Sequence, residues 1–86
     1  MPTISQFFGI VIRMYFDEHG VPHFHAIYGG DEAIMAIETL EIIEGGLPRR
    51  AVGFVLEWAA QHRHELRDNW ERARQHEALL PIEPLD

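Results

Sequence analysis

The sequence predicts an α+β domain in which a three-stranded antiparallel sheet packs on one or two C-terminal helices. Two observations lead to this fold class. Apolar residues alternate with a period of two through most of the first 38 residues, and from Pro48 onward their period becomes about 3.5, as in an amphipathic helix. Because the chain has 86 residues and an apolar share of 47%, we expect a single domain, residues 1–86, with a thin core.

The sheet is expected to be a meander of three strands, at about residues 5–16, 23–28 and 31–38. In the first strand the even positions from Phe8 to Phe16 are all apolar, which indicates one buried face. Acidic residues and Pro22 end this pattern before the second strand begins. Gly29 and Gly30 suit a two-residue hairpin turn, so we expect the third strand to follow directly.

The helical segment is expected over about residues 48–76, with Pro48 in its first turn. A single helix of that length would exceed the usual 8 to 20 residues, roughly. The polar run 61–64 also interrupts the apolar stripe, so we expect two helices, or one helix kinked there. Residues 79–85 are apolar but broken by prolines, which predicts an extended C-terminal tail.

Charge and composition limit the partners. The formal charge is −7, and all seven basic side chains are arginines, only one of which lies in the first 47 residues. Because phosphate backbones are bound by clustered positive charge, we do not expect this chain alone to bind nucleic acid. It contains no cysteine, no basic N-terminal leader pattern and no apolar run long enough for a bilayer, so we expect a cytoplasmic protein that does not enter a membrane.

The chemistry-bearing residues gather around a histidine pair. Strand alternation places His23 and His25 on one face of the second strand, and burial of the opposite face fixes the register. A two-residue turn then pairs His25 with Ile34 and brings Glu32 to a diagonal position, while the preceding loop carries His19. The prediction is a polar patch on the sheet face away from the helices, made of Arg13, Tyr15, His23, His25 and Glu32.

Several uses of this patch are open. It is either a plain polar, solvent-facing surface or part of a protein–protein surface whose acidity suits a basic partner. The two histidines could instead hold a transition-metal ion, with Glu32 or His19 as third ligand and one position left open; no other cofactor is expected. In metal-free acid–base chemistry on phosphate, one histidine would take a proton and the other would give one, with Arg13 stabilising charge and Tyr15 orienting.

Three residues of the helical segment are further binding candidates. Arg49 and Arg50 fall in the first helical turn, where cations oppose the macrodipole by a few tenths of a kcal/mol, so either an exposed functional role or a salt bridge to a nearby glutamate is expected. Trp58 lies off the apolar stripe and is a candidate interface residue. Trp70 continues the stripe and is expected in the core.

A set of short motifs carries a family resemblance over nearly the whole chain: Met1–Ser5, Phe8–Ile10, Ile12–Phe16, Pro22–His25, Glu38–Glu41, Leu47–Ala51 and Leu56–Ala59. In these motifs the chain resembles the small bacterial family called domain of unknown function 4160 (DUF4160). The resemblance implies no catalytic residues, because the family's activity is not established. It implies a context, since such genes often lie beside, or are fused to, another domain of unknown function, numbered 2442, in arrangements that look like toxin–antitoxin pairs.

We therefore expect a small binding or regulatory module that acts with a co-encoded protein partner, as in a toxin–antitoxin-like pair. It would use the face of Arg13, His23 and His25, or the exposed helix with Trp58. The alternative is an enzyme, either a His-dependent ribonuclease-like toxin or a metal-dependent hydrolase built on the two histidines. Because so short a chain buries a limited share of its surface, a homo-oligomer would also fit.

Overall fold

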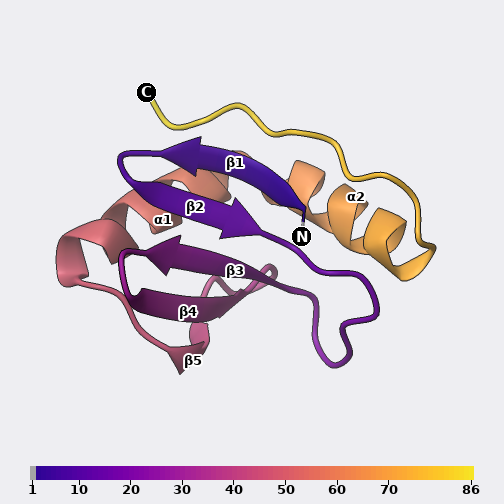
Figure 1. Cartoon of the computed structure of the whole chain (residues 1–86), viewed down its shortest axis with the longest axis horizontal. Helices are drawn as coiled ribbons and strands as arrows, with labels where there is room; N and C mark the ends of the chain where they lie inside the picture. Colours follow the sequence, from indigo (N-terminus) through magenta and orange to yellow (C-terminus); the bar gives the residue numbers. More distant parts are fainter. Residues whose placement is uncertain (1) are drawn as a thin grey trace.

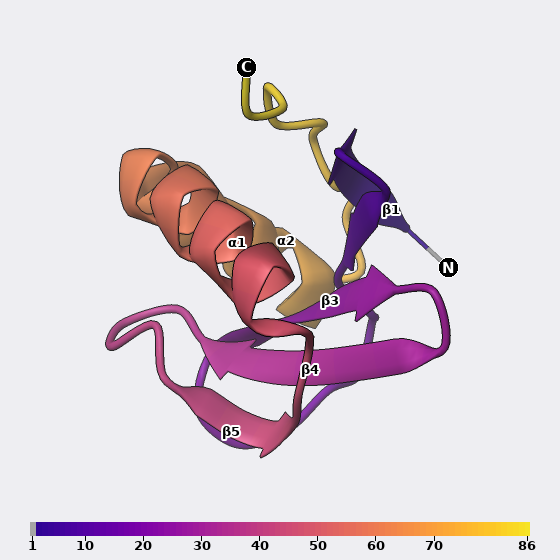
Figure 2. The ribbon, with the colours of Figure 1, turned by 90° about the vertical axis from the view of Figure 1, so that its left-hand side faces the viewer.

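The computed structural model describes residues 2–86 and contains a five-stranded sheet with two helices packed on one face (Figure 1). The strands are antiparallel neighbours in chain order: β1 (Thr3–Phe7), β2 (Ile10–Arg13), β3 (His23–Tyr28), β4 (Asp31–Ala36) and β5 (Ile42–Gly45). The helices are α1 (Arg49–Gln61) and α2 (Arg63–Arg74). Figure 2 shows both helices on the same side of the sheet. The α+β class is confirmed, but the expected number of three strands is wrong.

The first additional strand comes from residues 5–16, which form the hairpin of β1 and β2 instead of one long strand. Phe8 and Gly9 make its two-residue turn, with φ of 49° and 79°. Phe8, which was expected on the buried face, is 52% exposed, while Phe7 is buried in its place. An isolated glycine within a strand pattern is the one local sign of this turn.

The second additional strand is β5, which lies at the free edge beside β4. All four of its residues are exposed, so no alternation of apolar and polar residues marks it in the sequence. Gly45 has φ 74°, and a Cβ on it would lie 2.1 Å from the carbonyl oxygen of Glu32. Only glycine therefore fits where β5 approaches β4. The other two strands agree with the prediction, except that β4 ends at Ala36 and not near residue 38.

The helical segment divides at His62, where φ is −127° and ψ is 23°, so the expectation of two helices is confirmed. The expectation that Trp58 is an exposed interface residue is wrong. Its side chain is fully buried, with its ring 5.4 Å from that of Phe7 and 6.1 Å from that of Phe24. The buried stripe of α1 consists of Ala51, Val55, Trp58 and Ala59. It shares Val55 and Ala59 with the apolar stripe expected from the sequence, but it includes Trp58 in place of Leu56.

The C-terminal tail after α2 contains no helix or strand and runs beside β1 as an extended strap (Figure 1). The backbone N–H of Ile82 donates to the carbonyl of Ile4 at 2.7 Å, and the indole N–H of Trp58 donates to the carbonyl of Glu83 at 2.8 Å. The buried amide of Asn69 bonds both backbone groups of Leu80. The expected extended tail is confirmed, and it covers the β1 edge of the sheet.

No helix within residues 2–86 has both the length and the apolar character needed to cross a membrane.

Candidate functional site

The histidine pair lies where the sequence register places it. The predicted two-residue turn at Gly29–Gly30 pairs Tyr28 with Asp31 and His25 with Ile34, and both pairs are confirmed. On its other side His25 pairs with Arg13 of β2. Since His23 and His25 are two residues apart on β3, their side chains leave the same face of the sheet.

The histidines are not on an open surface. Each is only 8% exposed, because the loop between β2 and β3 folds over them, and the ring of His23 also lies 4.9 Å from that of Trp70 in α2. The alternative of a plain solvent-facing surface is therefore wrong for the two histidines, and the predicted position away from the helices is wrong for His23, which contacts α2. Strand alternation correctly gives the face on which the side chains lie, but it says nothing of a loop that closes over that face.

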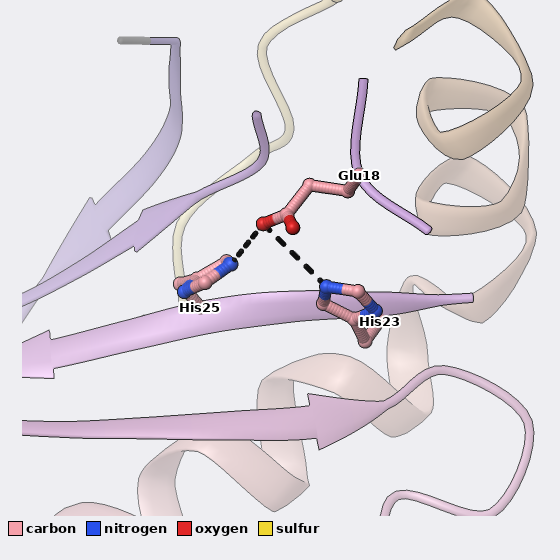
Figure 3. A group of neighbouring side chains, drawn as sticks. All are labelled: Glu18, His23 and His25. Atoms are coloured by element: carbon pink, nitrogen blue, oxygen red, sulfur yellow. Dashed lines mark hydrogen bonds and ion pairs between the residues drawn. The ribbon is translucent and has the colours of Figure 1, made fainter. Parts of the chain in front are cut away.

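The covering loop brings Glu18 to both histidines, as Figure 3 shows. Its Oε1 atom lies 2.6 Å from Nε2 of His25 and 3.6 Å from Nε2 of His23. One potential ligand atom from each of the three residues lies within 4.8 Å of the others. The Nε2 atoms of two buried rings and one carboxylate thus converge on a common point.

The opposite nitrogen of each ring is held by a second partner. Nδ1 of His23 lies 2.8 Å from the carbonyl oxygen of Val21, and Nδ1 of His25 lies 2.7 Å from Oε2 of Glu32. Because a carbonyl oxygen and a carboxylate only accept hydrogen bonds, each Nδ1 carries the hydrogen and donates it. Nε2 of His25 lies 2.6 Å from Glu18, so a proton or a cation must stand between these two atoms, which would otherwise be two facing acceptors. Nε2 of His23 faces the same carboxylate at 3.6 Å, beyond hydrogen-bond distance. We call Glu18, His23, His25 and Glu32 the histidine cluster.

The electrostatics of Glu18 agree with this arrangement. Burial works to raise the pKa of its carboxyl group, but the hydrogen bond from His25 and the positive charge of both rings outweigh burial. The net effect is a pKa below the ordinary value, so Glu18 stays ionised. The carboxylate is available as an anionic ligand or as the counter-ion of the imidazoles.

Contacts with the end of α2 hold the loop that carries Glu18. Asp17 has φ 64°, and its carboxylate lies 2.9 Å from Nε2 of His76. The ring of Phe16 stacks on His76 with a centroid distance of 6.1 Å. Beside Glu18 the surface forms a hollow of about 400 Å³, lined also by His19, Trp70 and Arg74. The loop thus places one side of Glu18 on the histidines and leaves the residue open to solvent on the other.

The other predicted patch residues are divided between this site and its surroundings. Tyr15 packs edge-on against His25, with ring centroids 4.6 Å apart, and Glu32 contacts His25 as described. Arg13 turns away and donates from Nε to the hydroxyl of Thr3 at 3.4 Å, so it does not stabilise charge at the histidines. His19 lines the hollow and is not among the converging ligand atoms.

Two further predictions differ from the structure. Arg49 and Arg50 make no salt bridge to a glutamate within residues 2–86, and they lie at the other end of the sheet, at the start of α1. Sequence reasoning also missed Glu18, because it read residues 17–20 only as a break between strands. The available signal was an acidic residue five and seven positions before the two histidines, close enough for a short loop to fold back over them.

The fold and the cluster define a small α+β domain in which two buried histidines face the partly exposed carboxylate of Glu18, and the exposed carboxylate of Glu32 bonds one of them. The sequence profile described as Domain of unknown function (DUF4160) matches residues 9–71, and the chain belongs to this family. The match contains the whole histidine cluster and leaves β1 and the C-terminal strap outside. Comparisons with curated proteins and with solved structures found no match.

Proposed function

We propose that this domain binds one divalent transition-metal ion between the Glu18 carboxylate and the Nε2 atoms of His23 and His25. One observation carries the proposal: both Nδ1 atoms are held by hydrogen-bond acceptors, while both Nε2 atoms point at the same carboxylate. Metal-binding histidines in proteins are oriented in this way by a carbonyl or carboxylate on the second ring nitrogen. Glu32 and the carbonyl of Val21 are these orienting groups.

The distances support an ion of this class. Ligands at about 2.0–2.2 Å from a tetrahedral ion lie roughly 3.3 Å from one another. The 3.6 Å between Glu18 and His23 is close to that separation, and the 2.6 Å hydrogen bond from His25 would open by less than about 1 Å as an ion replaces its proton. Two imidazoles and one carboxylate favour Zn²⁺, Co²⁺ or Ni²⁺ over Mg²⁺ or Ca²⁺, which prefer oxygen ligands.

The ligand number indicates the chemistry that such a site would support. Three protein ligands leave one position for water, as in hydrolytic zinc sites, and Glu18 also lines the neighbouring hollow of about 400 Å³. Among the enzyme classes expected from the sequence, a metal-dependent hydrolase therefore has more support than a metal-free ribonuclease. The latter needs a cation beside the histidines, and Arg13 points to Thr3.

A competing interpretation is a purely structural ion-pair cluster, in which a second proton on each ring faces the carboxylates. The test is a titration of metal-free, untagged protein with Co²⁺, followed by its visible absorption, and with Zn²⁺, followed by calorimetry. We expect one ion per chain, a d–d spectrum typical of four-coordinate Co²⁺, and thermal stabilisation by Zn²⁺.

Matched variants decide between the two interpretations. His23→Gln and His25→Gln should weaken binding by about a hundredfold or more, whereas His64→Gln, an exposed histidine of α2, should bind as the wild type does. If the wild type takes up no stoichiometric ion, or if all three variants bind equally, the proposal is wrong and the cluster is structural. Hydrolysis of a phosphodiester and of a carboxylic ester by the Zn²⁺-loaded protein then tests for an enzyme.

A second candidate function is the one that the family resemblance implies, a module that acts with a co-encoded protein partner. What favours it is a group of exposed aromatic and cationic side chains far from the histidine cluster, at the other end of the sheet. Binding to such a partner and binding of a metal ion are compatible, because they use different residues. A cytoplasmic location belongs to the same proposal.

A further inference from the structure

A surface hollow lies between the start of α1 and the sheet end opposite to the histidine cluster. It has a volume of about 500 Å³, and its walls are mostly apolar. The rings of Phe8, Tyr28 and Phe54 and the side chain of Arg50 line it; we call it the aromatic hollow. Phe8 is 52% exposed and Tyr28 is 39% exposed, so much of this apolar area faces solvent. Exposed apolar patches with polar margins are typical of interaction sites.

Phe8 occupies an unfavourable backbone conformation at the rim of the aromatic hollow. It has φ 49° in a two-residue turn with Gly9, a position where Asn, Asp or Gly is strongly preferred. A bulky residue with positive φ is a genuine outlier, and such strain is found mainly at functional positions. Its ring lies 4.9 Å from that of Phe54, so the two rings form one wall of the hollow. The turn therefore holds an aromatic ring outward where a small polar residue would suit the backbone better.

The two arginines at the start of α1, of which Arg50 lines the aromatic hollow, have no acidic partner within residues 2–86. Of the seven arginines, only Arg49 and Arg50 make no hydrogen bond or ion pair within residues 2–86, although the chain carries fourteen acidic residues. The guanidinium of Arg50 lies 5.6 Å from the centre of the Phe54 ring, at the margin of the hollow. The first turn of α1 holds no acidic residue. Two adjacent exposed arginines without an acidic partner in a chain of charge −7 are available to an anionic group from outside.

We propose that the aromatic hollow is the docking site for a peptide segment of a protein partner, which inserts a bulky apolar side chain and places an adjacent Asp or Glu on Arg49 and Arg50. This inference rests on the partner-binding candidate above and is independent of the metal site. Phe, Tyr and Arg are the residue types enriched in the centres of protein interfaces. Two arginines in an otherwise acidic chain suit a single carboxylate better than the repeated charge of a nucleic acid.

The test uses the full chain and a capped peptide with the sequence Gly-Glu-Phe-Glu-Gly as probe. In a titration followed by two-dimensional NMR of the labelled protein, we expect the shifted resonances to belong to the aromatic hollow and the start of α1. Phe8→Asn and Arg50→Gln should each weaken the affinity by about fivefold or more. A probe with Ser in place of Phe should bind about tenfold more weakly or not at all.

Two control variants match those changes elsewhere on the surface. Ile43→Asn removes an apolar side chain that is as exposed as Phe8, at 52%, and Arg67→Gln removes another exposed guanidinium. Both should bind the probe within about twofold of the wild type. Equal weakening by the control variants, shifts spread over the whole surface, or no difference between the two peptides would overturn the proposal.

The remaining outcomes separate the site from the function. If sedimentation shows a dimer that dissociates in Phe8→Asn, then a second copy occupies the hollow and the proposed partner is wrong. If the protein encoded beside this one binds the wild type and Phe8→Asn equally, the partner role stands, but the aromatic hollow is not its site. If that protein binds neither, while the peptide binds in the hollow as expected, the co-encoded partner fails and the docking site stands.

Discussion

The two ends of β3 satisfy their charged groups in opposite ways. At the His23 end, the ring of His25 bonds the carboxylates of Glu18 and Glu32, the ring of His23 bonds the carbonyl of Val21, and the Nε2 atoms of both rings face Glu18. At the Tyr28 end, aromatic rings are half exposed and two arginines have no partner within residues 2–86. On the two proposals above, the first end would bind a metal ion and the second end would bind a segment of a protein partner. Substitutions at the two ends should therefore differ in what they change, metal affinity at the His23 end and partner binding at the Tyr28 end.

The largest effect is expected from Gly45→Ala, which disturbs the backbone of Glu32 behind the histidine cluster. The new Cβ would lie 2.1 Å from the Glu32 carbonyl oxygen, in a residue with φ 74°. We expect a loss of more than about 2 kcal/mol in the free energy of unfolding, measured by urea denaturation. Gly46→Ala is the control, because no atom lies within 4 Å of its Cβ position, and it should be neutral or slightly stabilising. Equal losses in both variants would mean that this contact is relieved by movement of β5.

The next prediction concerns Glu32, which we propose orients His25 without being a metal ligand itself. Glu32→Gln keeps the side-chain shape but weakens the hold on Nδ1 of His25. We expect the affinity for Zn²⁺ to fall by about ten- to a hundredfold, less than on replacing His25 itself. Glu57→Gln, on the exposed side of α1, is the matched control and should leave the affinity unchanged. Calorimetric titration measures all three proteins, and an unchanged affinity in Glu32→Gln would show that Glu32 does not orient the ring.

A smaller effect is expected for stability at the other end of the sheet. Phe8→Asn relieves the strain of φ 49° but removes the ring contact with Phe54. Because these two contributions oppose each other, the free energy of unfolding should change by less than about 1 kcal/mol. Chemical denaturation of the two proteins measures this change. A loss of several kcal/mol would instead make Phe8 a core residue and weaken the argument that its exposure serves binding.

The smallest effect concerns the exposed pair of Glu38 and Arg67, which joins the chain after β4 to α2. The bidentate hydrogen bond from Arg67, at 2.7 Å to each oxygen, lowers the pKa of the Glu38 carboxyl group. A lowered pKa in the folded state stabilises the protein above the ordinary pKa of the group, and this contribution is lost as the pH falls through the folded value. Glu38→Gln should therefore be slightly less stable than wild type at neutral pH, and the difference should be smaller at about pH 3, where part of the contribution of the carboxylate is lost. Urea denaturation at both pH values gives the comparison, and a large difference would show that the pair is not a surface contact.

Burial explains which elements of the fold the sequence could predict. The β3–β4 hairpin has alternating apolar residues and a two-glycine turn, and its register follows from them residue by residue. β5 has four exposed residues and packs no side chain in the core, so no burial pattern marks it. The turn at Phe8 and Gly9 was missed for the opposite reason: Phe8 is apolar although it is exposed, so it continued the apolar pattern of a strand through the turn.

In the candidate site, too, residues placed by strand pairing could be predicted, and the residue placed by a loop could not. The faces of His23, His25 and Glu32 follow from pairing within one sheet, and these three were predicted correctly as neighbours. Glu18 reaches them from a loop whose path depends on contacts with the end of α2, at His76. Side chains that meet through tertiary contacts of a loop leave no periodic trace, so Glu18, the proposed third ligand, could not be chosen over His19 or Glu32 from the sequence.

The strap over β1 also sets an order of events during protein synthesis. Ile4 is synthesised long before Ile82, whose backbone N–H group donates to the Ile4 carbonyl. Until Ile82 has emerged, β1 has an uncovered strand edge. The hydrogen bond from the indole of Trp58 to the carbonyl of Glu83 likewise forms only after residue 83 has emerged. The sheet edge at β1 is therefore covered only after residues 82 and 83 have emerged, and in the nascent chain β1 is an edge open to pairing with a neighbouring chain.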